Sequence, residues 1–401
     1  MLFGKKPIER ATERFEKAED LFEANQYRKS GKYFASAGEI FFEEKISFER
    51  AKESFFNAAR SFLNDERFED VLRCLRLAGN SALQEKDQIL EANKFFTNSI
   101  EYITYLKDKE DRDYNYVLFS VLNYMCLFLK GKSEKGLNLL KKIKKRVDDS
   151  YFKESKLIHL ITDFILAIRD NKLAYLEKVE SNFNDYGELK EAEKKLIKNV
   201  IMVAKTSINI VPHLQIKEKQ YTTNDVIDLH AEIKTDSLLD FKENSFYNYE
   251  IKSLKIIQIR LNLSDNLTSQ NKVELPLDIE PGKTLNWDYK IKPHFLVEES
   301  RIGPIKMTCK IDDKFICYLD SNSVIKPNII SPPASLDVSI KNLRPPLIGK
   351  TFPLEIFIEN NSDGEAADLD IVVEFPRELQ VMRGTTEKNE EKKKFPFSIK
   401  L

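Results

Sequence analysis

The 401-residue sequence has little cysteine, one proline in its first 211 residues and no long apolar run. Four cysteines are too few to form the disulfide framework of a small secreted protein. The most apolar run, YNYVLFSVLNYMCLFL at 114–129, contains polar residues and is shorter than a membrane span requires, so it predicts a buried helix. The N-terminal stretch MLFGKKPIERATERF lacks the apolar core of a signal peptide. These absences predict a cytoplasmic protein.

The sequence also has no excess of either sign of charge and no recognisable catalytic motif. Lysine and arginine number 64 against 65 aspartates and glutamates, so the net charge of −1 favours neither a nucleic-acid partner nor an acidic substrate. The sequence contains no glycine-rich phosphate loop, no HExxH and no nucleophile elbow, and its four histidines are scattered. We therefore expect no enzymatic activity, no catalytic, cofactor or metal site and no small-molecule substrate. An enzyme with an unrecognised site is the least favoured interpretation.

The distribution of proline divides the chain into two regions. Pro7 is followed by no other proline until Pro212, and 13 of the 14 prolines lie at or beyond that position. Proline breaks helix interiors but is tolerated in turns and at strand edges. We therefore predict a helical region at 8–210, followed by β structure that is rich in isoleucine, valine and threonine.

A repeat of about 20 residues occurs within the helical region. Its units start at Tyr27, Phe48, Phe68 and Ile89, and apolar residues follow at offsets that mark one face of a helix. Pairs of small residues stand between the aromatics, which allows neighbouring helices to approach closely. We expect one helix per unit and an antiparallel helical solenoid. Further helices are predicted at 112–130, 133–148, 150–169, 172–185 and 187–208.

The order of aromatic and small residues in the first units resembles the soluble NSF attachment proteins, which are relatives of tetratricopeptide-repeat solenoids. The resemblance covers about residues 10–105. It implies a helical solenoid that offers an extended groove to a protein partner. The residues that carry it are Tyr27, Ser30, Gly31, Phe34, Ala37, Gly38, Phe48, Ala51, Phe55, Ala58 and Ala59.

Alternating apolar residues beyond residue 212 predict a β-sandwich at 218–330, with a hairpin around Asp312 and Asp313. Cys309 and Cys317 face each other across this hairpin if its loop has an odd number of residues. A proline-rich linker at 326–335 precedes a second unit at 334–401. Its stretches FIENN at 357–361 and GEAA at 364–367, followed by Val372 and Val373, are similar to immunoglobulin-like sandwiches of the CARDB and adaptor-appendage types. The predicted fold is thus multidomain, α then β: a helical solenoid followed by two immunoglobulin-like β-sandwiches.

The second sandwich is short for its type. Its last segment, KKKFPFSIKL, resembles LNWDYKIKP of the first sandwich, where further strands follow. We favour a fragment or a natural truncation. The alternative is a sandwich with an open edge that accepts a strand from a partner or from a second copy.

Two basic features are candidate binding sites for an anionic membrane surface or an acidic partner. A solvated helix face and a frayed N-terminus are the plainer interpretations of the same residues. The first candidate set is Lys130, Lys132, Lys135, Lys141, Lys142, Lys144, Lys145 and Arg146; the second is the apolar pair Leu2 and Phe3 with Lys5 and Lys6.

The expected function is a non-enzymatic scaffold or adaptor for protein–protein interactions, in an assembly of the membrane-trafficking kind, with a protein partner that the sequence does not identify. The layout of a solenoid followed by appendage-like sandwiches resembles vesicle-coat adaptors and tethering-complex subunits. The alternative is a peripheral membrane protein that binds anionic lipid through the basic residues of 130–146 and the N-terminus.

Overall fold

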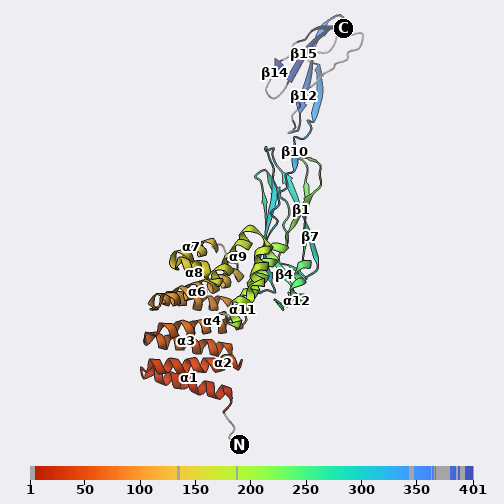
Figure 1. Cartoon of the computed structure of the whole chain (residues 1–401). Helices are drawn as coiled ribbons and strands as arrows, with labels where there is room; N and C mark the ends of the chain where they lie inside the picture. The colour runs from red at the N-terminus through yellow and green to blue at the C-terminus, as the bar shows by residue number, and fades with distance from the viewer. Residues whose placement is uncertain are drawn as a thin grey trace.

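The computed structural model describes residues 5–132, 136–186, 188–342, 347–362, 364, 366, 380–384, 387–388 and 393–400. Within these ranges, helices occupy the chain up to residue 209 and mainly antiparallel sheets occupy the rest. The molecule is elongated, with the helices stacked at one end and the last sheet at the other (Figure 1). No helix in the described ranges combines the length and the apolar character needed to span a bilayer.

The helical region consists mostly of helices that pack against their neighbours in sequence. Helices α2 to α5 begin at Tyr27, Phe48, Phe68 and Ile89, so the predicted repeat starts are confirmed. The helices are α1 (Pro7–Glu23), α2 (Tyr27–Glu43), α3 (Phe48–Asn64), α4 (Phe68–Gln84), α5 (Ile89–Tyr102), α6 (Lys109–Leu129), α7 (Gly136–Arg146), α8 (Asp149–Glu154), α9 (Lys156–Asp170), α10 (Leu173–Ser181) and α11 (Glu191–Asn209), with 3-10 turns η1 (Ile103–Tyr105) and η2 (Phe183–Asp185).

The prediction of a single helix at 150–169 is wrong. The chain forms two helices there, α8 and α9, separated at Ser155, whose backbone is extended with φ −66° and ψ 118°. Serine is a weak helix former because its side chain competes for backbone hydrogen bonds. The periodicity of the apolar residues continues across the break, which is why the sequence pattern does not reveal it.

Small residues and phenylalanines interlock between the repeated helices. A Cβ added at Gly31 would lie 2.8 Å from the Phe62 ring, and one at Gly79 would lie 2.4 Å from the Phe96 ring. Gly38 faces Phe55 in the same way. The small residues therefore make room for aromatic side chains of the following helices, as the sequence predicts.

The β region begins directly after α11. Its strands are β1 (His213–Ile216), β2 (Gln220–Thr222), β3 (Ile227–Lys234), β4 (Leu254–Leu263), β5 (Leu267–Ser269), β6 (Leu277–Ile279), β7 (Thr284–Pro293), β8 (Ile302–Ile311), β9 (Phe315–Asp320), β10 (Asn328–Ile330), β11 (Leu336–Asn342), β12 (Thr351–Asn360), β13 (Gln380–Gly384), β14 (Glu387–Lys388) and β15 (Lys393–Lys400). A 3-10 turn, η3 (Asp236–Leu238), and a short helix, α12 (Asp240–Glu243), follow β3.

Two four-stranded sheets follow the helices, in the orders β1-β3-β7-β5 and β6-β4-β8-β9, and β10 pairs with β2. Burial alternates along β3, where Ile227 and Leu229 are buried and Asp228 and His230 are exposed. One face of this strand therefore belongs to the core. The predicted hairpin is confirmed: β8 and β9 place Cys309 opposite Cys317, and both thiols are buried and free.

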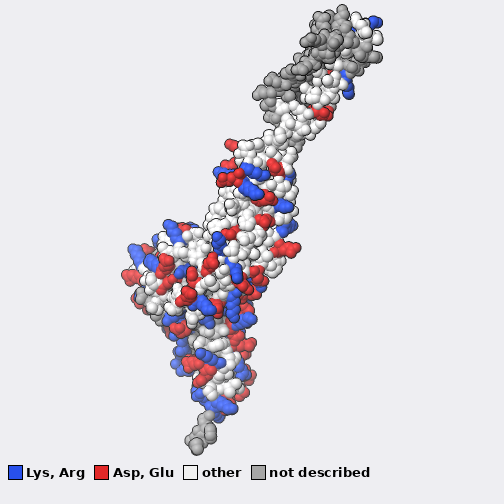
Figure 2. Space-filling model, turned by 90° about the vertical axis from the view of Figure 1, so that its right-hand side faces the viewer, with Lys and Arg blue, Asp and Glu red and all other residues white. Residues whose placement is uncertain are grey.

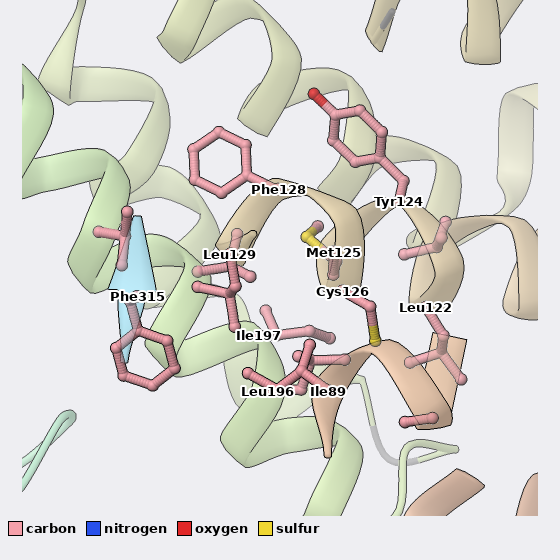
Figure 3. Packing of buried hydrophobic residues seen from close by; sticks show 14 of the residues in the cluster. Ile89, Leu122, Tyr124, Met125, Cys126, Phe128, Leu129, Leu196, Ile197 and Phe315 are labelled. Carbon is pink, nitrogen blue, oxygen red and sulfur yellow. The ribbon is translucent and has the colours of Figure 1, made fainter. Parts of the chain in front are cut away.

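Helix α11 joins the helical region to the sheets. It packs on α4 and α6 on one side and on β9 on the other. Phe315 of β9 is fully buried and belongs to the same hydrophobic core as Leu129 of α6 and Ile197 of α11 (Figure 3). The Tyr318 hydroxyl also donates a hydrogen bond of 2.6 Å to the carbonyl of Gly131, at the end of α6. The joint therefore combines an apolar core with polar contacts at its rim.

The last sheet has the strand order β11-β12-β15-β13, with β14 paired to β15. The part of the second predicted unit that includes Val372 and Val373 lies outside the described residues. The strand predicted around Phe357 is β12.

We expect Gly79→Ala to destabilise the helical region. Intrinsic helix propensity alone favours alanine by about 1 kcal/mol, but forcing a methyl group into a filled core costs about 1–3 kcal/mol. Urea unfolding followed by circular dichroism measures the difference. Adding Phe96→Leu makes space for the methyl group, so the double variant should lose less stability than the two single changes together. A Gly79→Ala variant more stable than the parent would contradict this packing.

Candidate functional site

A groove of about 650 Å3 runs along the face formed by α2, α4 and α6. Helices α2, α4 and α6 all contribute side chains to its lining. The segment that leads into α11 also borders the groove. Its lining residues are Glu39, Glu43, Glu69, Leu72, Arg73, Arg76, Leu77, Leu106, Asp111, Asn115, Phe119 and Lys190.

The groove has an apolar floor and an acidic rim. Leu72, Leu106 and Phe119 are buried and form part of the core. Four carboxylates stand at the rim and are exposed, and none of them forms an ion pair with another described residue. These are Glu39, Glu43, Glu69 and Asp111.

The basic side chains of the groove are fewer and partly engaged. Arg73 lies 3.7 Å from Asp70, and Lys190 is exposed at the start of α11. Arg76 is held by a buried carboxylate and is not free to bind a ligand's anion. The carboxylates at the rim therefore outnumber the cations that remain available.

A buried ion pair closes one side of the groove. Arg76 of α4 donates two hydrogen bonds of 2.7 Å to the carboxylate of Glu193, which is fully buried at the start of α11. Asn80 and the backbone N–H of Lys190 donate to the same carboxylate, at 3.0 and 2.8 Å. Burial works against the charge of Arg76, but the hydrogen bonds and charge of Glu193 outweigh it and raise the guanidinium pKa above its ordinary value.

The groove combines apolar and acidic side chains. In the described part of the chain, no three His, Cys, Asp or Glu side chains are grouped to hold a metal ion. A groove with a few buried apolar side chains and a carboxylate rim suits a segment that presents an apolar anchor and basic side chains.

The basic residues predicted from the sequence fall into separate places. Five of them lie on α7 and are exposed: Lys141, Lys142, Lys144, Lys145 and Arg146. Lys141, Lys142 and Lys145 share one helix face because of their spacing. None of the five forms an ion pair with another described residue, although Arg146 lies 4.4 Å from the centre of the Tyr116 ring.

The other predicted site residues are not part of the α7 face. Lys130 is half-buried at the joint, where its ammonium donates a hydrogen bond of 3.4 Å to the carbonyl of Lys314. Lys132 is exposed in the turn that follows α6. Lys5 forms an ion pair with Glu13, and the backbone N–H of Lys6 donates to Glu9. The remaining predicted residues, Leu2, Phe3 and Lys135, lie outside the described ranges.

The sequence predicted a groove on the helical region but not the residues that line it, although a signal was present. Glu39 and Glu43 are four residues apart and stand on the same face of α2, and Glu69 is near the start of α4, two repeat units later. Only the packing of the helices brings residues of α2 and α4 to one groove. On the face of the molecule shown in Figure 2, acidic and basic side chains are intermixed over the helical region.

No family model, curated protein or solved structure matches this chain, so the proposals that follow rest on its residues and geometry.

We expect Glu193→Ala to lower the free energy of unfolding by about 3–5 kcal/mol, because it leaves the Arg76 charge without its buried partner. Glu191→Ala is the matched control in the same helix. The Glu191 side chain is 89% exposed and its pair with Lys194 is on the surface, so its loss should change stability by less than about 1 kcal/mol. Chemical unfolding of both variants measures the two effects. Equal losses would show that the buried pair does not hold α11.

Proposed function

We propose that this chain is a non-enzymatic scaffold or adaptor, and that the groove between α2, α4 and α6 is its docking surface for a protein segment. The observation that carries the proposal is the combination of rim carboxylates that form no ion pair with another described residue and buried leucine and phenylalanine side chains in the floor. The partner segment would place an apolar side chain against Leu72, Leu106 and Phe119, and lysine or arginine side chains against Glu39 and Glu43.

The architecture that we propose for this role is a solenoid of the kind found in soluble NSF attachment proteins, followed by immunoglobulin-like sandwiches. Regular spacing of the helix starts and the close approach of glycine to phenylalanine support the solenoid. The two sheets with alternating burial support a sandwich after it. A membrane-trafficking assembly in the cytoplasm is the setting that this layout favours, by architectural analogy.

A scaffold of this kind works without a moving part. The interlocked phenylalanines and the buried Arg76–Glu193 pair hold the walls of the groove in place before the partner arrives. Rigid walls reduce the loss of conformational entropy on binding. The exposed carboxylates would speed the encounter with a basic segment, and this effect should weaken as salt rises.

The double variant Glu39→Lys with Glu43→Lys tests the groove. We expect it to lose proteins that the parent chain captures from its own cell extract, because the added cations repel a basic segment. Glu53→Lys on α3 is the control, since Glu53 is exposed and does not line the groove. The capture is done with membranes present and after their removal by detergent. An unchanged set of captured proteins for the groove variant would refute docking in the groove.

Binding of anionic lipid through α7 is a second candidate function. Five exposed basic side chains without an ion pair among the described residues favour it. Lysines close to an anionic bilayer contribute about 1 kcal/mol each. The exposed Leu137 at the start of α7 is an apolar side chain that could enter the headgroup layer.

Reversal of Lys141, Lys142 and Lys145 to glutamate tests lipid binding. We expect the affinity for phosphatidylserine vesicles to fall by roughly a hundredfold or more, and neutral phosphatidylcholine vesicles to bind neither protein. The control reverses three exposed lysines on other segments, Lys86, Lys94 and Lys107. Cosedimentation at two salt concentrations measures the effect. Equal binding by the α7 variant and the control variant would rule out a specific lipid surface on α7.

A further inference from the structure

Strand β11 is an exposed edge of the last sheet. Among the strands that the structure describes, it pairs only with β12, and it stands at the end of the strand order β11-β12-β15-β13. Each residue from Leu336 to Lys341 is exposed. The strand thus offers a free row of backbone donors and acceptors, which is a template for pairing with another strand.

The hydrogen-bonding pattern shows which residues face this free edge. The N–H of Asn361 donates a bond of 2.8 Å to the carbonyl of Ser335, and these two residues extend the β11–β12 register. Hydrogen-bonded pairs alternate along an antiparallel ladder. Residues 337, 339 and 341 therefore bond to β12, and the backbone groups of residues 336, 338 and 340 point to the free edge.

The side chains of β11 divide between two chemically different faces. Leu336, Val338 and Ile340 are 37%, 58% and 61% exposed, an unusual state for three apolar side chains on one strand. The opposite face carries an acid, a hydroxyl and a base, in the order Asp337, Ser339 and Lys341. This face has opposite charges placed symmetrically about Ser339.

We propose that β11 pairs with β11 of a second copy of this chain, antiparallel and with the twofold axis at Ser339. In this register Asp337 of each copy stands opposite Lys341 of the other, so two opposite-charge pairs form. Val338 stands opposite Ile340 of the other copy, so two apolar pairs form as well. Val338 and Ile340 both point their backbone groups to the free edge. Because they stand opposite each other, they can exchange the backbone hydrogen bonds of an antiparallel ladder.

Neighbouring registers lack this match. Centring the axis on Val338 places Asp337 opposite Ser339, and centring it on Ile340 places Lys341 opposite Ser339. Shifts by a single residue would bring edge-facing backbone groups against groups that already bond to β12. Opposite charges across a ladder stabilise it and like charges destabilise it, so the charges select the register centred on Ser339.

The charged side chains of β11 are available for this pairing. Neither Asp337 nor Lys341 forms an ion pair with another described residue. Lys341 lies 5.0 Å from the centre of the Phe357 ring but stays exposed. Within the chain, Asp337 stands opposite another acid, Glu359 of β12.

Pairing through β11 goes beyond the proposed scaffold function and does not depend on it. The last sheet lies at the opposite end of the molecule from the groove (Figure 1). A dimer would therefore present two grooves, far apart, to one assembly. Two linked sites bind a partner with two matching segments more tightly than one site does.

Sedimentation equilibrium of the full chain tests the proposal. The parent chain should form a dimer in the micromolar range, as expected for a small interface. Asp337→Lys alone and Lys341→Asp alone should each weaken the dimer by roughly tenfold or more, because each change creates two like-charge pairs. An equal mixture of the two variants should form heterodimers as well as the parent does, since both charge pairs are then restored. The variant that carries both changes should also dimerise.

A strictly monomeric parent chain would overturn the proposal and leave the edge to a strand of another protein. A dimer that neither charge reversal weakens, or one that the mixture does not restore, would overturn the register.

Cysteine cross-linking gives a second, independent readout. Ser339→Cys places two thiols on the twofold axis, in a pair of closely spaced residues, so mild oxidation should link the two copies. Ser335→Cys is the control: it is also exposed, but the two copies of residue 335 would stand at opposite ends of the paired strands. Linkage of both variants to the same extent would indicate random collision and refute the pairing.

Discussion

The buried carboxylate of Glu193 is the constraint on which the arrangement of the molecule depends. A carboxylate can be fully buried only if hydrogen bonds and an opposite charge replace the water that it loses. Arg76, Asn80 and the Lys190 backbone supply them, and all three are held at fixed positions by α4 and the start of α11. The polar end of α11 is thereby placed on α4, and its apolar length then lies between α6 and β9.

Because α11 packs on both the helices and β9, it connects the two regions of the molecule. One end is an array of helices with a groove lined by α2, α4 and α6, and the other is a sheet with a free edge strand. The joint between the helical array and the sheet that contains β9 is filled by Phe315 and closed at its rim by the Tyr318–Gly131 hydrogen bond. Burial lowers the pKa of Lys314 at this joint, and nearby Lys195 adds to the effect. The joint between the helical array and β9 is therefore packed.

Prediction from the sequence succeeded where the signal was local and failed where it was not. The repeat starts at Tyr27 and Phe48 were predictable, because an aromatic residue followed by small residues at helical offsets defines one face of one helix. The break at Ser155 was not, because the apolar periodicity runs through it. Lys130 looked like a member of a basic cluster, since it is close to α7 in sequence; the end of α6 directs it to the joint instead.

The sequence by itself determined the division into helical and β regions, through the placement of proline, and the contact of glycine with phenylalanine between repeats. Both follow from the steric properties of single residues and their near neighbours. Only the tertiary structure decided the rest. It set Glu193 against Arg76 across 117 positions of sequence, gathered the carboxylates of α2 and α4 at one groove, and left β11 at an edge. These relations depend on how whole elements pack, and no short-range pattern of residues encodes them.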